Sequence, residues 1–258
     1  MGHPILQANT KISQPTKIVL IVGWIISTLL FWTFVLPNAS KLIPSPIEVA
    51  HAGLIAWNQG IVAQLISSIF TSLSAIFFSM LIGLGLAYLS TFPIFAAPVQ
   101  AIGSMRVMSL TGILFIFVLA TPNGYWLKVA TLTFSIVVFL VNSMLQVIDD
   151  IPQSKFDHAR TLGMNQFQVL YEVVVRGTLA NAFDVIRMTA AMAWMMLTAV
   201  EANARSDGGI GITLIELARQ SNYAGILFVQ FLILVVGIGQ DQFIQFTKSV
   251  VCPYTKAQ

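Results

Sequence analysis

The stretch Gln146-Val-Ile-Asp-Asp-Ile-Pro-Gln-Ser-Lys-Phe-Asp-His-Ala-Arg-Thr-Leu-Gly163 is the longest polar interruption between two strongly apolar segments of this chain. It contains signals for the start and the end of a helix. Pro152 and Ser154 offer a start, and Ser154 and Asp157 have the spacing of a capping box. Gly163 suits a helix C-terminus because glycine tolerates positive φ. We therefore predict a helix of about nine residues between these signals, displayed outside the apolar segments.

Two further features of this stretch indicate a surface for another protein. Asn165 is placed to cap a second short helix after the turn at Gly163. The first helix has an apolar side and a basic side, formed respectively by Phe156, Ala159 and Leu162 and by Lys155, His158 and Arg160. A short amphipathic helix held between two turns has the form of a docking element.

The composition places the chain among membrane proteins. Of its 258 residues, 57% are hydrophobic and 9% are charged, and the mean hydropathy is +0.83. Soluble globular proteins carry about 25% charged residues, so we predict an all-α protein that crosses a lipid bilayer several times. The net charge of +3 is too small to indicate nucleic-acid binding. The single Cys252 and the scattered His3, His51 and His158 show no metal-ligand spacing, so no metal is expected.

The apolar runs predict about six membrane-spanning helices, because about 20 apolar residues cross a bilayer. The expected spans are 18–36, 63–89, 94–120, 125–148, 179–202 and 224–239, the last continuing toward 248. Between spans, 37–62 is expected to hold an amphipathic helix that starts at Ser45-Pro46. The segment 201–223 is expected to be re-entrant or to lie on the surface.

The distribution of basic residues predicts the orientation. Six spans place both termini on one side, and most lysines and arginines outside the spans fall there, which the positive-inside rule assigns to the cytoplasm. Lys41, Arg205 and Arg219 are exceptions. The expected organisation is a cytoplasmic N-terminal tail at 1–16, one transmembrane domain at 17–250 with its main loop at 149–177, and a C-terminal tail at 251–258.

The sequence contains no Gly-x4-Gly-Lys-Ser/Thr phosphate loop, so the chain is not expected to hydrolyse ATP itself by that route. Energy for transport would come from a partner protein or from an ion gradient. A gradient-driven secondary transporter or channel would call for carboxylates inside the membrane, and the first four expected spans contain none. A membrane-embedded enzyme would need clustered His, Asp or Glu residues, whereas the histidines here are scattered.

The segment Asp157-His-Ala-Arg-Thr-Leu-Gly163, followed by Gln168-Val-Leu170 and Val173-Val-Val175, resembles the EAA loop of ATP-binding-cassette (ABC) importer permeases. The family pattern is Glu-Ala-Ala, then a glycine, and later Ile-x-Leu-Pro. This chain likewise has a small residue for close approach, charged neighbours and a glycine for the sharp turn. It departs from the pattern twice, with Asp157-His158 in place of Glu-Ala and Val175-Arg176 in place of Leu-Pro.

Further segments resemble permeases of the importers for nitrate, sulfonate, taurine and bicarbonate. Leu42-Ile-Pro-Ser-Pro-Ile-Glu-Val49 looks like the Leu-Pro-Ser-Pro-x-x-Val segment of that subfamily. Other similar pieces are Thr71-Ser-Leu73, Arg187, Ala193-Trp194, Ala199-Val-Glu201 and Gly209-Ile-Gly211-Ile-Thr-Leu214. The resemblance covers residues 35–250, in order and at family-like spacing.

The resemblance implies a type I ABC importer permease fold with a cytoplasmic coupling helix that passes the motion of an ATPase to the membrane helices. It implies a second permease copy or a paired permease, ATPase subunits that carry ATP and Mg, an extracytoplasmic substrate-binding protein, and a multi-pass location in the inner membrane. The implied substrate is a small anion such as nitrate, sulfonate, taurine or bicarbonate. The residues implied for ATPase docking are Asp157, His158, Ala159, Arg160, Leu162 and Gly163.

Candidates for the translocation path or a gate are Arg106, Arg187, Trp194 and Glu201. Because a charge inside a membrane is costly, Arg187 is expected either to pair with Asp184, three residues earlier, or to line the route of the anion. Arg106 is expected either inside the third span or snorkelling toward its surface.

The other two candidates have equally plain structural interpretations. Trp194 belongs to a cluster with several methionines, and such clusters are more often packing than a binding cage. Glu201 follows Thr198 at the outer end of the fifth span. It belongs either to a gate or to the surface that meets a substrate-binding protein, or it caps the following turn together with Arg205.

Overall fold

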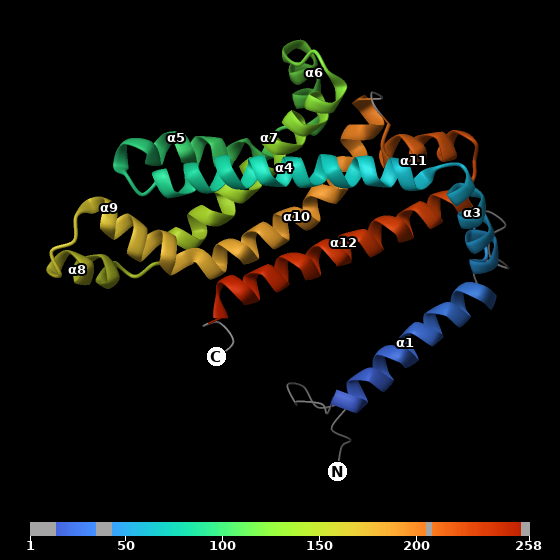
Figure 1. Cartoon of the computed structure of the whole chain (residues 1–258), viewed down its shortest axis with the longest axis horizontal. Coiled ribbons are helices and arrows are strands. Elements are labelled where there is room, and N and C mark those ends of the chain that lie inside the picture. The colour runs from blue at the N-terminus through green and yellow to red at the C-terminus, as the bar shows by residue number, and fades with distance from the viewer. Residues whose placement is uncertain (1–13, 35–42, 205–207, 254–258) are drawn as a thin grey trace.

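The computed structural model describes residues 14–34, 43–204 and 208–253, which form helices joined by short turns without any strand among them (Figure 1). The all-α prediction is confirmed. In chain order the elements are α1 (Gln14–Phe34), α3 (Pro46–Asn58), α4 (Ile61–Leu89), α5 (Pro93–Ser104), the 3-10 turn η1 (Met105–Val107), α6 (Leu110–Ala120), α7 (Gly124–Asp149), α8 (Gln153–Thr161), α9 (Gln166–Val169), the π-helical segment η2 (Leu170–Val175), α10 (Arg176–Ala204), α11 (Ile210–Arg219) and α12 (Tyr223–Val251).

Four helices in the described part of the chain are long and apolar enough to cross a membrane. They are α4, α7, the continuous 39-residue helical stretch Gln166–Ala204, and α12. A fifth span is possible if α5 with η1 and α6 are counted together. The first expected span coincides with α1, whose apolar part, Val19–Thr33, is shorter, while residues 35 and 36 lie outside the described ranges.

The third expected span, 94–120, is not a continuous helix. The two segments Pro93–Val107 and Leu110–Ala120 meet at an angle of 113°. The backbone leaves the helical region at Met108 (ψ 139°) and Ser109 (ψ 129°). Hydropathy reports only that residues are apolar and not that the chain turns between them. The apolar run 94–120 therefore did not predict this bend.

The amphipathic helix expected within 37–62 is α3, which begins where predicted. Ser45 is extended (ψ 156°) and its side chain accepts from the Glu48 N–H, while the Glu48 carboxylate accepts from the Ser45 N–H at 2.8 Å. This is a reciprocal capping box, with proline at the first helical position, Pro46. The capping box and the proline that fix the start of α3 thus lie within one helical turn of each other.

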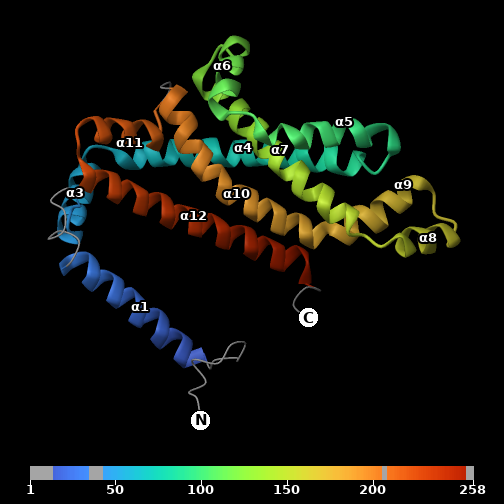
Figure 2. The same cartoon turned by 180° about the vertical axis from the view of Figure 1, so that it is seen from behind.

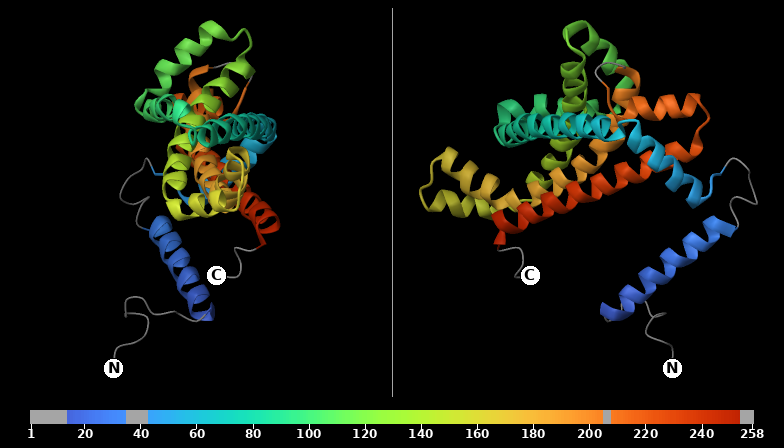
Figure 3. Two further views of the ribbon diagram at one scale, coloured as in Figure 1. Left: turned by 90° about the vertical axis from the view of Figure 1, so that its left-hand side faces the viewer. Right: turned by 45° about the vertical axis from the view of Figure 1, so that its right-hand side comes forward.

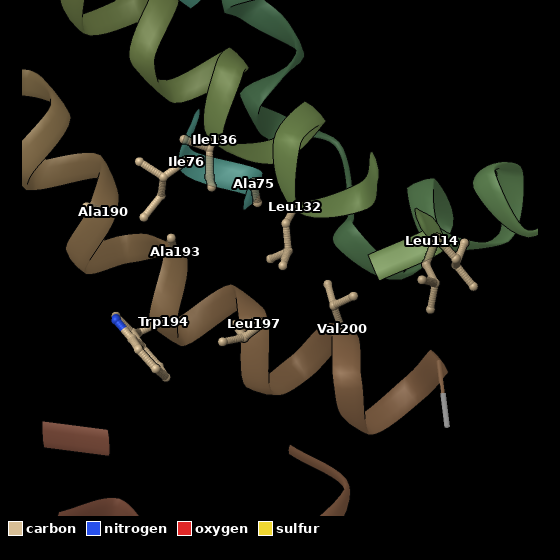
Figure 4. Close-up of a cluster of buried hydrophobic side chains, with 11 residues drawn as sticks. Ala75, Ile76, Leu114, Leu132, Ile136, Ala190, Ala193, Trp194, Leu197 and Val200 are labelled. Atoms are coloured by element: carbon tan, nitrogen blue, oxygen red, sulfur yellow. The ribbon is translucent and has the colours of Figure 1, made fainter. Parts of the chain in front are cut away.

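The centre of the bundle is formed by α4, α7 and α10. Their buried side chains meet in one cluster with Leu114 of α6 and include Ala75, Ile76, Leu132, Ile136, Ala190, Ala193, Trp194, Leu197 and Val200 (Figure 4). Small residues allow close approach of membrane helices. At Gly83, for example, an added Cβ would lie 2.8 Å from Leu140 Cδ2. Of the long helices α7 is the most enclosed, with 61% of its most apolar window buried against 11% for α12.

The two ends of the bundle carry different short elements. Figures 1 and 2 show α8 and α9 at one end and α3 and α11 at the other, with α4, α10 and α12 running between them. The views in Figure 3 show α1 apart from the bundle. It is joined to the rest of the chain through Trp32, whose ring stacks on Phe231 of α12 with centroids 5.9 Å apart and whose Nε1 donates to the Pro44 carbonyl at 3.0 Å.

Candidate functional site: an exposed helix, cross-helix ion pairs and a buried polar cluster

The predicted docking helix exists as α8, nine residues long. Its start differs in detail from the prediction. Pro152 is the N-cap residue, with an extended backbone (ψ 136°), and no side chain caps the helix. The capping box of Ser154 with Asp157 is therefore wrong, because the helix begins at Gln153 and Ser154 already lies inside its first turn.

The predicted end of α8 is confirmed. Gly163 has φ +76°, and an added Cβ would meet nothing within 4 Å, so the glycine is needed for the backbone conformation alone. Asn165 caps α9 as expected. Its side chain accepts from the Gln166 N–H at 2.6 Å, and its own N–H donates to Gln168 Oε1 at 2.8 Å.

Most of the surface of α8 is exposed. Ala159 is its one buried residue at 4% exposure, and Phe156 is half-buried against a cluster formed by α7 and α10. His158 is exposed, Leu162 is 63% exposed, and Asp157 pairs with Arg160 at 3.4 Å. The helix is thus seated through Ala159 and Phe156, while its charged residues and Leu162 remain available for contact.

The departure at Val175-Arg176 has a structural counterpart. Where the resembled pattern has a proline, this chain runs from α9 through the π-helical turn η2 into α10 as one helical stretch. Arg176 bridges back to Glu172 at 2.9 Å. A proline inside a helix removes a backbone hydrogen bond, and its absence lets the segment after α8 continue unbroken into a membrane-spanning helix.

Arg187 is paired, but not with Asp184. Its guanidinium makes two hydrogen bonds to Asp241 of α12, one of them from Nη2 to Oδ2 at 2.7 Å. Asp184 instead accepts from Lys248 of α12, with Nζ 2.7 Å from both carboxylate oxygens. The expected pairing within α10 is wrong because α12 brings a complementary charge against each of the two residues.

These two ion pairs line a groove between α10 and α12 and remain partly exposed, with 39% of the Arg187 side chain and 32% of the Asp241 side chain accessible. Trp194 lies further along the same contact. Its indole ring is buried and its Nε1 donates to Gln240 Oε1 at 2.8 Å. Arg187 and Trp194 therefore both attach α12 to α10.

Glu201 is fully buried near the other end of α10. Its carboxylate accepts from Ser68 Oγ of α4 at 2.7 Å and from the N–H of Gly211, in the first turn of α11, at 2.9 Å. Ser68 Oγ in turn accepts from the Ile210 N–H at 2.8 Å. Arg205, the partner considered for Glu201 from the sequence, lies outside the described residues.

Lys128 of α7 completes this polar cluster, which we call the outer cluster and define by Gln64, Ser68, Lys128, Glu201 and the backbone of 208–211. Lys128 is 1% exposed, donates from Nζ to the Gly208 carbonyl at 2.7 Å, and attracts the Glu201 carboxylate electrostatically. Gln64 Oε1 accepts from the Gly209 N–H at 2.6 Å. The sequence reasoning missed Lys128, although a lone lysine within the apolar run 125–148 was a signal for it.

Arg106 lies in η1, at the bend between α5 and α6, and is exposed. It faces a small cavity whose other walls come from α6, α7 and α10. The four path candidates consequently do not form one site. Glu201 belongs to the outer cluster, Arg187 and Trp194 to the α10–α12 contact, and Arg106 to a separate cavity, while all six docking residues lie on or beside α8.

Comparisons with known proteins identify the fold. No protein-family model matches the chain, and none of the curated proteins matches it. Solved structures do. An inward-facing MetNI methionine ABC transporter aligns with TM-score 0.59 and 17% identity over 74% of this chain and 94% of that chain. A second crystal form of the same transporter aligns with TM-score 0.56 and 18% identity, over 74% of this chain and 93% of that chain. An amino acid ABC transporter with histidines aligns with TM-score 0.60 and 13% identity, over 77% of this chain and 95% of that chain.

The chain has the fold of an ABC importer permease. With identities of 13–18%, the likeness concerns the fold and does not identify a substrate. It does fit the expected arrangement of several membrane-spanning helices, including those on either side of α8.

Proposed function

We propose that this chain is the transmembrane permease subunit of an ABC importer and forms the translocation path for a small anion such as nitrate, sulfonate, taurine or bicarbonate. The observation that carries the proposal is α8. It is a short, exposed helix between two membrane-spanning helices of a chain with the permease fold, and it bears the residues that resemble the EAA loop. The substrate class rests on the segments that resemble the nitrate and sulfonate subfamily.

In this proposal α8 is the coupling helix. An ATPase subunit, which holds ATP and Mg, binds the exposed surface of Asp157, His158, Arg160 and Leu162. Buried Ala159 keeps α8 seated, and Gly163 directs the chain back toward α9. Since η2 joins α9 to α10 without a break, displacement of α8 is transmitted to α10, and the path alternates between its two open states.

The remaining partners follow from the two ends of the bundle. The end with α8 faces the cytoplasm, as do both termini, and the end with α3 and α11 faces the substrate-binding protein outside the inner membrane. A second permease copy completes the path. Glu201 holds the outer gate by joining α10 to α4 and α11, and Arg187 and Trp194 keep α12 attached to α10 during the movement.

A second candidate is supported by one observation. The outer cluster places the carboxylate of Glu201 and the ammonium of Lys128 together in the buried parts of two membrane-spanning helices. Ionisable groups buried within membrane-spanning helices are typical of proton and sodium sites in gradient-driven transporters. The alternative function is therefore a secondary transporter or channel that uses this pair.

Uptake into proteoliposomes separates the two functions. The chain is reconstituted with the ATPase and the binding protein encoded beside it, and radiolabelled nitrate, bicarbonate or taurine is added outside. Uptake that requires both the binding protein and ATP on the ATPase side supports the importer. Uptake without ATP that follows an imposed proton or sodium gradient, and is lost in Glu201→Gln, contradicts it and supports the alternative.

A further inference from the structure

Arg106 lies at an unusual place for a charged residue. Its cavity, of about 120 Å³, is lined also by Met105, Met108, Phe134, Ser135 and Met196. Phe134 and Ser135 lie near the middle of α7, which is long and apolar enough to cross a membrane. The guanidinium is therefore level with the hydrocarbon core of the bilayer, too far from either end of α7 for simple snorkelling to a headgroup.

The charge of Arg106 has no counterpart in the part of the chain that the structure describes. Its guanidinium forms no ion pair and no hydrogen bond there. The other basic residues of the long helices differ in this respect: Arg187 and Lys248 pair with carboxylates, and Lys128 is buried in the outer cluster. An unpaired arginine turned to lipid at this depth is costly.

The described residues of a second copy do not supply the missing carboxylate. The carboxylates of α10 and α12 are Asp184, Asp241 and Glu201, and all three are engaged within each copy. The other described carboxylates belong to α3, α8, η2 and α11 or lie at the α8 end of α7, and these elements lie at the ends of the bundle (Figure 1). None of the described carboxylates of either copy therefore supplies the counter-charge at this level.

We propose that Arg106 is a binding residue for the transported anion, at the bend between α5 and α6 in the middle of the membrane. A guanidinium offers a planar fork of N–H donors that matches two oxygens of an oxyanion. The ligand class is accordingly a small oxyanion, and the methionine and Phe134 walls of the cavity offer no charged group that competes for the guanidinium. That the anion is transported rests on the proposed function, whereas the binding of an oxyanion at Arg106 does not.

The site is tested by thiol labelling of the full chain in phosphatidylcholine nanodiscs. Cys252 is the only native cysteine and is buried, so Cys252→Ser gives a silent background. Met108→Cys, at a position 49% exposed beside Arg106, reports the cavity, and Leu81→Cys, at a position 68% exposed on α4, is the control for a lipid-facing surface. Each variant is treated with an anionic and a cationic methanethiosulfonate reagent.

The proposal predicts three results. Met108→Cys reacts with the anionic reagent, whereas Leu81→Cys reacts with neither charged reagent. Replacing Arg106 with Gln lowers the ratio of anionic to cationic labelling rates about tenfold, since one positive charge attracts anions locally. Nitrate, bicarbonate or taurine at constant ionic strength slows labelling only while Arg106 is present, and Arg106→Lys keeps part of the charge effect. An elution volume and an unfolding free energy equal to those of the parent show that Arg106→Gln remains folded.

Other results overturn the proposal. If Met108→Cys resists both charged reagents as Leu81→Cys does, the residue faces lipid. If Met108→Cys reacts but Arg106→Gln changes neither the ratio nor the protection, the guanidinium binds no anion. If phosphatidylglycerol slows labelling and the free anions do not, the ligand is a lipid headgroup. Because no ATPase is present, these outcomes are independent of whether the chain couples to one.

Discussion

The exposed helix α8 and the outer cluster lie at opposite ends of the bundle and are held in place in opposite ways. In α8 only Ala159 is buried, and the one ion pair joins two of its own exposed residues, Asp157 and Arg160. In the outer cluster Glu201 is fully buried and bonds to Ser68, 133 residues away in sequence. One end is left largely exposed, while the other is assembled within the chain.

This contrast determines how much each region contributes to stability. An exposed pair such as Asp157 with Arg160 contributes about 0.2–1 kcal/mol at most. Removing one member of a buried network leaves its partners unsatisfied, which costs about 3–5 kcal/mol when the survivor is a buried charge. Changes in the outer cluster should therefore affect folding, and changes in α8 should affect binding of a partner.

The largest expected effect comes from Glu201→Ala. It leaves Lys128 buried without its carboxylate and removes the acceptor of the Ser68 hydroxyl and the Gly211 N–H. We expect a loss of about 3–5 kcal/mol in the free energy of unfolding, measured by reversible unfolding in mixed micelles. Glu216→Ala, at an exposed position of α11, is the matched control and should change it by less than about 0.5 kcal/mol. Equal effects of the two variants would show that the outer cluster is not a special point of stability.

A smaller effect is expected from Gly211→Ala, which tests the close approach of α11 to α10. Its Cβ would meet the Thr198 carbonyl oxygen and would lie 2.8 Å from Glu201 Cβ. Overpacking of this kind costs about 1–3 kcal/mol. Gly85→Ala on α4 is the control, because a Cβ there meets nothing within 4 Å, and its effect should be neutral or stabilising in the same assay.

At the α8 end, Gly163→Val and Gly163→Asn should differ from each other. The left-handed conformation at φ +76° is strained by about 1–2 kcal/mol for an ordinary residue, and asparagine tolerates it best. Valine should therefore distort the turn and weaken ATPase binding, measured as the ATPase co-purified per permease, while the unfolding free energy falls by no more than about 1–2 kcal/mol. Normal ATPase binding by Gly163→Val would separate the turn from docking.

The smallest effect is expected at the ion pair of Arg187 with Asp241, which lies between the two ends of the bundle. A double-mutant cycle of Arg187→Met and Asp241→Asn should give a coupling energy of about 0.5–1 kcal/mol, because both side chains are partly exposed and screened. The cycle of Asp184→Asn with Lys248→Met is the matched comparison. A coupling energy near zero would assign Arg187 a role other than attaching α12 to α10.

The same contrast explains what the sequence predicted. The end of α8 at Gly163, the cap at Asn165 and the start of α3 are set by residues within one turn of each other, so they were found. Of the two signals for the start of α8, Pro152 is the N-cap residue, whereas the capping box of Ser154 with Asp157 does not form. Helix ends that are set by neighbouring residues can therefore be predicted from a single sequence to within about two residues.

Features that depend on distant neighbours were not predictable in the same way. The partner of Arg187 is on α12, 54 residues away, and the pairing with Asp184 that looked best within one helix was wrong. Lys128 and Ser68 meet Glu201 only because three helices converge. The bend at Met108 likewise changes direction within an apolar run, and hydropathy does not record direction.

The most direct measurement of the coupling proposal is co-purification of the tagged chain with the proteins encoded beside it, followed by an ATPase assay. We predict a stable complex that hydrolyses ATP. We predict also that scrambling 157–162 abolishes the complex, while the unfolding free energy and the elution volume of the chain remain as in the parent. A folded chain that recruits no ATPase, or a scrambled variant that recruits it normally, would contradict the assignment of α8 as the coupling helix.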